Sequence, residues 1–240
     1  MTTKYWGAQG VKLTVSFMDT TSAALRTRIL SHMNAWNRDA NVSFVETQQK
    51  GQVRIAFTKG DGYWSYVGTD IGLIPSNEPT MNLDSFTMNT PDSEFHRVVR
   101  HEAGHTLGFI HEHMRRALVA KIDEEKAISF FMATQGWTKE EVRAQVLTPI
   151  EESSLRATTP DPNSIMCYQI SGELTVDGEP IPGGVDIDEL DHALCAKLYP
   201  TPSHEATLTR TTTTQHGGTL LFLPETDPAY IAAVIAAATR

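Results

Sequence analysis

The chain has 240 residues, of which 40% are hydrophobic and 8% aromatic, as in a soluble globular protein of one domain or of two lobes around a cleft. Its formal net charge of −9 disfavours nucleic acid and anionic membranes as main partners, because phosphate groups are bound by basic surfaces. No apolar run is long enough to span a bilayer.

The N-terminal part of the chain alternates between strand and helix patterns. It opens with MTTKYWGAQG, which lacks the basic and apolar regions of a signal peptide, so we expect no export signal in the chain as given. Residues 11–18 alternate apolar and polar side chains and predict a half-buried strand. Residues 21–38 repeat apolar side chains every 3.6 residues and predict an amphipathic helix capped by Thr21 or Ser22. Further strands are predicted at 41–47, 52–57 and 80–86.

Helical patterns dominate the chain after these strands. One helix is predicted to begin with Asp92 as its N-cap and to end near Leu107, because Gly108 suits the left-handed position after a helix. Others are predicted near 122–134, 138–147 and 187–198, the second with a capping box from Thr138 to Glu141. The tail, residues 201–240, combines a β-prone run, the apolar run TLLFLP and an alanine-rich helix capped by Asp227. We expect it to dock on the body or on a second subunit, and the oligomeric state stays open.

The stretch RHEAGHTLGFIHEH holds four histidines and two glutamates. On a helix, His101 and His105 project from one face, the spacing that two imidazoles need to share a tetrahedral metal ion. Glu102 lies beside them, placed to take a proton from bound water. Gly108 lets the chain reverse, so that His111 can supply a third ligand and a fourth position is left for water, as in catalytic zinc sites. A chance match on a solvated helix is the alternative, which Gly108, His111 and the later SIM-Y pattern disfavour.

Beyond this geometry, the chain resembles the metzincin clan of zinc endopeptidases in the pattern His101-Glu102-x-x-His105-x-x-Gly108-x-x-His111. The segment GFIHEHMR, with Glu112 after the third histidine, is similar to the astacin family within that clan. The segment SIMCY is similar to the methionine turn of astacins, with Tyr168 two residues after Met166. The resemblance runs from about Lys4 to Pro200.

The resemblance implies an α+β metzincin (zincin-like) fold with a zinc cleft between two lobes. The N-terminal lobe, about residues 1–111, would hold a twisted mixed sheet, a backing helix and the active-site helix. The C-terminal lobe, about residues 112–200, would be mostly irregular and helical. Residues 1–200 would then form the astacin-like protease domain, and residues 201–240 a C-terminal extension of unknown role.

The resemblance also implies a function, the hydrolysis of internal peptide bonds in proteins or peptides with one catalytic Zn²⁺ ion. The implied zinc ligands are His101, His105 and His111. Glu102 matches the general base that activates the zinc-bound water. Tyr168 matches the tyrosine that ligates zinc at rest and swings away to stabilise the oxyanion. The structural residues implied at the site are Gly108, Glu112 and Met166.

Three departures from the family pattern bear on the prediction. Cys167 replaces the usual histidine of the methionine turn, and we expect an inert small residue in preference to a redox-sensitive thiol. Cys167 and Cys195 are too few for a disulfide framework; two free thiols are favoured over one bridge, and no oxidising compartment is needed. In the family, Glu112 matches a glutamate that pairs with the new N-terminus once a pro-segment is removed. Only five residues precede Trp6, so the chain is near-mature or the latch differs. Family members are usually secreted, and the compartment of this chain stays open.

Two other function classes are weighed against proteolysis. A zinc-containing pseudo-protease that only binds peptides is disfavoured because Glu102 and Tyr168 are both intact. Hydrolysis of a non-peptide amide is barely distinguished from proteolysis. His113 is expected to support the site or lie at the surface without ligating metal. By the resemblance, the strand near Thr80–Leu83 is expected to be the exposed edge that pairs with substrate.

Overall fold

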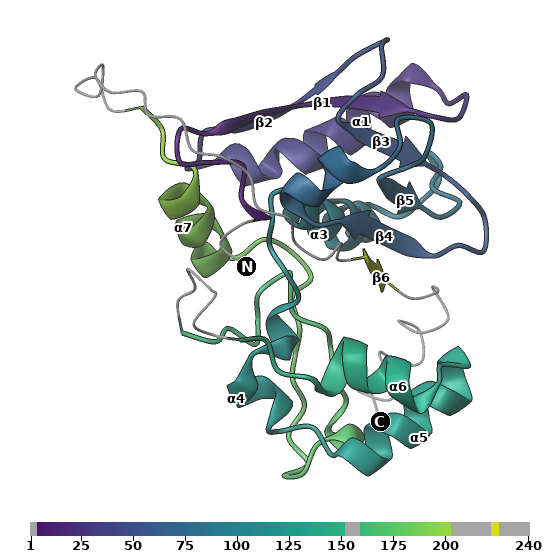
Figure 1. Cartoon of the computed structure of the whole chain (residues 1–240), viewed down its shortest axis with the longest axis vertical. Helices are drawn as coiled ribbons and strands as arrows, with labels where there is room; N and C mark the ends of the chain where they lie inside the picture. Colours follow the sequence, from purple (N-terminus) through teal and green to yellow (C-terminus); the bar gives the residue numbers. More distant parts are fainter. Residues whose placement is uncertain (1–3, 152–158, 203–221, 226–240) are drawn as a thin grey trace.

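The computed structural model describes residues 4–151, 159–202 and 222–225, and it has a sheet-containing lobe above a smaller lobe of helices and irregular chain (Figure 1). The strands are β1 (Val11–Phe17), β2 (Val42–Glu46), β3 (Val53–Ala56), β4 (Tyr63–Tyr66), β5 (Met81–Leu83) and β6 (Phe222–Glu225). The α-helices are α1 (Ala23–Met33), α2 (Asp92–Glu94), α3 (Arg100–Thr106), α4 (Arg116–Val119), α5 (Glu124–Gln135), α6 (Lys139–Val142) and α7 (Glu189–Leu198). This combination of helices and a sheet confirms the predicted α+β class. In the described part of the chain, no helix combines the length and apolar character needed to cross a bilayer.

The sheet is mixed, with the strand order β2-β1-β3-β5-β4-β6. Strands β2, β1, β3 and β5 run parallel, whereas β4 is antiparallel to both β5 and β6. The predicted alternation of the first strand is present, since Leu13 and Val15 are fully buried between more exposed neighbours. Side chains from α1 and α3 join these strands in one hydrophobic core.

The first helix is capped by one of the two expected residues, because the Ser22 hydroxyl accepts a hydrogen bond from Leu25 N at 3.2 Å. It ends at Met33 and continues as a 3-10 turn, earlier than the predicted end at residue 38. Asn34 accounts for this early end: its side-chain amide accepts from Phe44 N and donates to Phe44 O, which ties the turn to β2.

The helix that carries the histidine motif is built in three parts, α2, a π-helical turn (Phe95–Val99) and α3. The prediction of Asp92 as its N-cap is wrong by one residue. Pro91 holds that position without a side-chain cap, because the Asp92 carboxylate instead accepts from Arg28 at 2.8 Å. Gly108 has a φ of +96°, which confirms the left-handed conformation expected after the helix.

The expectation that Thr80–Leu83 forms the exposed sheet edge is wrong, because β5 lies between β3 and β4. The buried side chain of Asn82 explains the order. Its amide donates to Gly62 O at 2.6 Å and accepts from Thr58 N at 2.8 Å, which holds the turn before β4 against β5. The turn thereby delivers β4 to the outer side of β5.

A second hydrophobic cluster fills the smaller lobe, drawing on α4, α5, α6 and the segment between Cys167 and Ile181. The predicted capping box of Thr138 and Glu141 is confirmed at the start of α6. Helix α7 returns to the first lobe, where Cys195, Leu198 and Tyr199 join the larger core. Both cysteines are buried and free, as expected. Of the tail, residues 201–202 and β6 are described; the helix expected at Asp227 lies outside the described residues.

Candidate metal centre

Three imidazoles converge where α3 ends. His101 and His105 stand one turn apart on the helix, and His111 follows the chain reversal at Gly108. The Nε2 atom of His105 lies 3.0 Å from Nε2 of His101 and 3.2 Å from Nε2 of His111. Nitrogen ligands at about 2.0–2.1 Å from a tetrahedral Zn²⁺ stand about 3.3 Å apart. The spacing of the three nitrogens is therefore close to that of a set shared by one such ion.

Hydrogen bonds behind two of the rings fix which nitrogen carries the proton. His101 Nδ1 lies 2.6 Å from Ile165 O, and His105 Nδ1 lies 2.8 Å from Phe109 O. A carbonyl oxygen only accepts, so each Nδ1 is the donor and, in the neutral ring, each Nε2 presents a lone pair to the other. Burial lowers the pKa of His111 well below its usual value, which likewise favours the neutral, ligating form. Facing lone pairs repel unless a cation lies between them, so this donor set fits a metal ion.

Two residues predicted to do chemistry are brought to the histidines. Glu102 lies on α3, between His101 and His105 in the sequence, and is fully buried. Tyr168 arrives from the distant methionine turn, and its ring centroid lies 4.3 Å from that of His111. The buried ring of His113 stacks on Tyr168 with centroids 4.2 Å apart and ring planes 13° apart. Its Nε2 lies 3.1 Å from Gln145 O, so His113 is a buried neighbour of the tyrosine and does not lie at the surface.

Met166 lies beneath the helix, against Gly104. A Cβ at Gly104 would stand 2.5 Å from Met166 Sδ and 2.9 Å from Trp36 Cζ2, so no other residue fits here without movement. Gly104 was not predicted from the sequence to be part of the site, although a glycine inside a helix is a recognisable signal of close packing. The methionine turn is also held from α7: Asp191 accepts from Ser164 Oγ at 2.6 Å and Ile165 N at 2.9 Å. No local sequence signal marked Asp191 for this role.

Glu112 is bonded to the methionine turn and to the segment that precedes it. Its backbone N–H donates to Met166 O at 2.7 Å, and its carboxylate accepts from Asp161 N at 3.0 Å and Arg115 at 3.1 Å. Burial raises the pKa of this carboxyl to about 7. Near the N-terminus, the buried Lys4 ammonium pairs with Asp70 at 2.5 Å, which fixes the first described residue on the turn after β4.

Cys167, which replaces the family histidine of the methionine turn, is buried, and burial raises the pKa of its thiol. A thiol held in its protonated form is a weak nucleophile. This agrees with the expectation of an inert small residue at that position.

A second cluster, His32, Asp92 and His96, has ligand-type atoms within 4.8 Å of one another. Here His32 Nδ1 accepts a hydrogen bond from Arg100 Nε at 3.3 Å. Burial lowers the pKa of His32 to about 4, so the ring is neutral and its proton sits on Nε2, the atom that faces Asp92. Arg28 also pairs with Asp92. The cluster is therefore a network of hydrogen bonds and ion pairs. In it the Nε2 atom of His32 carries a proton and so has no lone pair for a metal ion.

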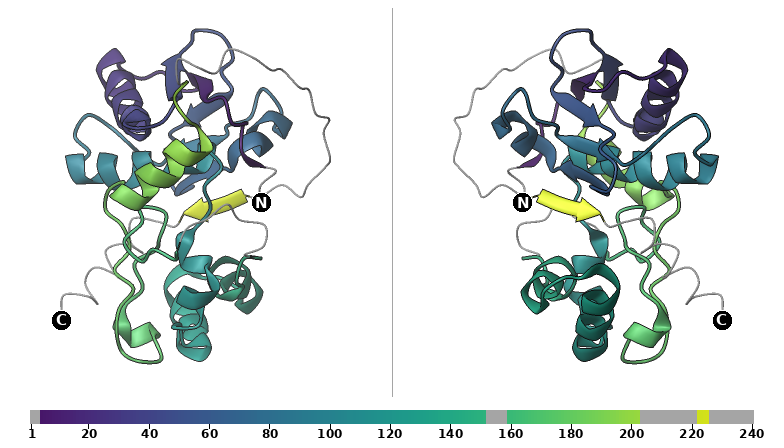
Figure 2. Two further views of the ribbon diagram at one scale, coloured as in Figure 1. Left: turned by 90° about the vertical axis from the view of Figure 1, so that its left-hand side faces the viewer. Right: turned by 90° about the vertical axis from the view of Figure 1, so that its right-hand side faces the viewer.

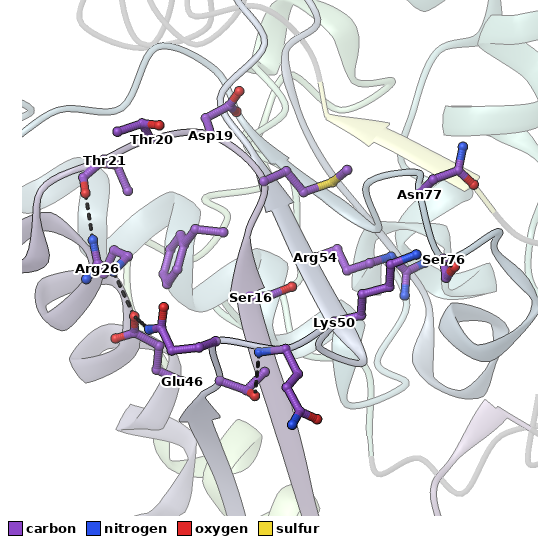
Figure 3. Close-up of a pocket in the computed structure, with 15 residues that line it drawn as sticks. Ser16, Asp19, Thr20, Thr21, Arg26, Glu46, Lys50, Arg54, Ser76 and Asn77 are labelled. Carbon is purple, nitrogen blue, oxygen red and sulfur yellow. Dashed lines mark hydrogen bonds and ion pairs between the residues drawn. The ribbon is translucent and has the colours of Figure 1, made fainter.

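A polar hollow of about 490 Å³ lies at the end of β1, and Figure 3 shows the side chains that line it. Its charged groups are engaged within the protein. Arg26 pairs with Glu46 at 2.8 Å, and Arg54 donates to backbone carbonyls that include Glu78 O at 2.7 Å. The hollow shares no residue with the histidine centre, and its charges serve to hold loops at this end of the sheet.

Residues 1–172 match the model of the peptidase family Astacin. The chain belongs to the astacin family. Membership confirms the predicted enzyme class, a zinc metalloendopeptidase that acts on proteins or peptides, and the predicted single catalytic zinc ion. Astacin family members are typically secreted, in line with the expectation from the resemblance.

Individual relatives agree with the family assignment. The chain is 32% identical over 90 residues to zinc metalloproteinase nas-27 of Caenorhabditis elegans, a match that covers 38% of this astacin chain and 19% of that relative. The solved structure of myroilysin is 31% identical, with a TM-score of 0.78, and the match covers 83% of this chain and 97% of that one. High choriolytic enzyme 1 of the medaka fish Oryzias latipes shares the fold at 18% identity and a TM-score of 0.56, covering 83% and 96% of the two chains.

Proposed function

We propose that this chain cleaves internal peptide bonds with a zinc ion held by His101, His105 and His111. The observation that carries the proposal is the pair of Nε2 atoms of His101 and His105, 3.0 Å apart, on rings whose Nδ1 atoms both donate to carbonyls. Zinc bound there would polarise the scissile carbonyl and lower the pKa of a bound water.

In this proposal, Glu102 is the general base. It takes a proton from the attacking water and then delivers that proton to the leaving amine. Its full burial on α3 supports the role, because a carboxylate enclosed by protein can exchange a proton with the reacting groups without competition from bulk solvent.

Tyr168 would contact the metal at rest and would donate a hydrogen bond to the oxyanion of the tetrahedral intermediate. Its support is the packing of its ring against His111 and His113, which keeps the phenol at the edge of the histidine cluster. A donor held in place before the reaction loses little free energy to reorganisation during it.

We further propose that the protease unit is residues 1–200, with lobes of about 1–111 and 112–200, although the family model ends at residue 172. The reason is that Asp191 holds the turn on which Ile165 and Met166 lie, and Tyr199 donates to Leu107 O at the end of the active-site helix at 2.5 Å. A unit without α7 would lose both supports. The tail from residue 201 would then be an appended segment.

The test compares the zinc-loaded parent with Glu102→Gln and Tyr168→Phe on a fluorogenic peptide library, with metal content measured for each protein. Glu102→Gln should keep zinc and lose activity by about 10²–10⁴-fold. Tyr168→Phe should lower kcat by about 10²-fold with little change in KM. A chelator should abolish cleavage by the parent. Undiminished cleavage by Glu102→Gln would refute the assignment of Glu102 as the general base. A zinc-loaded parent protein that cleaves no peptide would refute the proposed peptidase activity.

A further inference from the structure

The short strand β6 pairs with β4 from the far end of the chain. It runs antiparallel to β4, with Ser65 opposite Leu223 and Tyr63 opposite Glu225. In Figures 1 and 2, β6 lies beside β4 in the region between the two lobes. Without β6, the outer edge of β4 would be the last edge on this side of the sheet, since β5 is its other neighbour.

The hydrogen bonds of β4 show which of its residues offer backbone groups to that edge. Tyr66 N donates to Thr80 O at 3.0 Å, on the β5 side. Backbone groups alternate between the two sides of a strand, so Trp64 also faces β5, whereas Tyr63 and Ser65 turn their N–H and C=O outward. These two residues are the ones that stand opposite β6, Tyr63 opposite Glu225 and Ser65 opposite Leu223.

The proline in β6 fits this register. Pro224 stands opposite Trp64, a position whose backbone groups face β5 and need nothing from β6. The nitrogen of Pro224 is thus on the outer side of β6, where a missing N–H costs no ladder hydrogen bond. A slip of one residue would place the proline opposite an outward-facing residue and remove a bond. The sequence of the segment therefore suits the observed pairing. Its proline also removes a hydrogen-bond donor from the outer edge of β6, which disfavours the addition of a further strand there.

Strand β4 lies against the catalytic helix. It contacts α3, which carries His101, Glu102 and His105. The side chains of the proposed site, with His111 and Tyr168 included, are 0–6% exposed. A polypeptide that adds to the outer edge of β4 would run alongside this helix, and an extended strand is the form in which a sheet edge binds a peptide.

We propose that residues 222–225 of this same chain, paired with the outer edge of β4, keep that edge from an extended peptide substrate. One edge binds one strand, so the segment competes with any peptide that uses the edge. The competition with substrate rests on the proposed function, whereas the pairing of β6 with β4 does not. The segment thus acts as an intramolecular inhibitor that lowers the fraction of molecules open to substrate.

The test uses the full-length protein with Leu223→Pro, which removes the N–H that faces Ser65. Leu223→Ala is the matched variant that keeps the N–H, and Thr213→Pro places a proline in the tail outside β6. Hydrogen exchange should show faster exchange at the amides of Tyr63 and Ser65 in Leu223→Pro alone. A labelled peptide with the sequence TLLFLPET, residues 219–226, should bind that variant about tenfold more tightly than the parent, if the edge is about 90% occupied. The KM for an extended peptide substrate should fall by the same factor, with kcat unchanged.

Each readout can fail separately. Unchanged exchange at Tyr63 and Ser65 in Leu223→Pro would overturn the pairing. Faster exchange without tighter binding of the TLLFLPET peptide would overturn the competition for the edge. Absence of hydrolysis in every variant would refute the proposed function alone, because exchange and peptide binding do not depend on turnover. Protection of the β4 amides that rises with protein concentration would assign the occupant to a second copy and overturn the intramolecular assignment.

Discussion

Replacing Gly104 by alanine tests how closely the methionine turn supports the catalytic helix. A Cβ at this position would stand 2.5 Å from Met166 Sδ and 2.9 Å from Trp36 Cζ2. The Trp36 ring cannot retreat easily, since it is 1% exposed, donates from Nε1 to Arg100 O at 2.8 Å and stacks on Phe109. The strain must therefore be relieved mainly by Met166, which is itself only 3% exposed.

Two opposing terms set the magnitude. Alanine in place of glycine stabilises a helix interior by about 1 kcal/mol. Extra volume in a packed core costs about 1–3 kcal/mol, and the two contacts under 3.0 Å at Gly104 place the cost near the upper end. We expect Gly104→Ala to lower the free energy of unfolding by about 1–2 kcal/mol. Zinc affinity should fall by about tenfold or more, because Met166 is covalently joined to Ile165, whose carbonyl orients His101.

The assay is urea unfolding of the zinc-loaded proteins, with zinc affinity measured by competition with a chromophoric chelator. Gly72→Ala is the matched control, because no heavy atom lies within 4 Å of a Cβ there and its φ is not in the left-handed range. It should be neutral or stabilising by less than about 1 kcal/mol. Equal behaviour of the two variants, with zinc affinity unchanged in both, would refute the close support of α3 by Met166.

Three further predictions concern groups around the site. Burial raises the pKa of Asp191 from 3.8 to about 6, so between these values the folded protein keeps a proton that the unfolded chain has lost, and this group's contribution to stability falls as pH rises. Asp191→Asn should therefore become more stable relative to the parent from pH 5 to pH 7.5 in urea titrations; a constant difference would contradict the shift. His113→Ala should lower kcat about tenfold at near-constant KM, whereas His113→Phe, which keeps a ring against Tyr168, should retain most activity; equal loss in both would exclude stacking as the cause. Lys4→Met breaks a buried ion pair and should cost about 3 kcal/mol, part of which Asp70→Asn should restore in the double variant; strict additivity of the two changes would show that the pair is not coupled.

The parts of the site that could be predicted from sequence are those set by covalent neighbours. The spacing of His101 and His105 on one helix face follows from 3.6 residues per turn, and the reversal before His111 follows from the conformational freedom of Gly108. The capping box at Thr138 was predictable for the same reason. In each case the interacting groups lie within a few residues of one another, so no knowledge of tertiary packing is needed.

Strand order could not be predicted in this way. The segment that forms β4 has three consecutive buried residues, Tyr63, Trp64 and Ser65, so it lacks the alternation by which a half-buried strand is recognised. Its place outside β5 depends on the side chain of Asn82, which bonds to the turn residues Thr58 and Gly62. An edge is a property of the whole sheet, and a motif near Thr80–Leu83 carries no information about which neighbour lies beyond it.

One chain of hydrogen bonds links the local histidine motif to the tertiary packing around it. Asp191 on α7 holds Ile165 N at 2.9 Å, and the carbonyl of Ile165 lies 2.6 Å from His101 Nδ1. The tautomer that directs a lone pair of His101 toward His105 is therefore stabilised by a carboxylate that follows it by ninety residues in sequence. Helix α7 is in turn fixed by the burial of Cys195 and Leu198 in the larger core. Because each link orients the next, loosening α7 should weaken zinc binding even when the HExxH helix itself stays folded. The local motif supplies the proposed ligand atoms, and the packing of a distant helix helps to orient them.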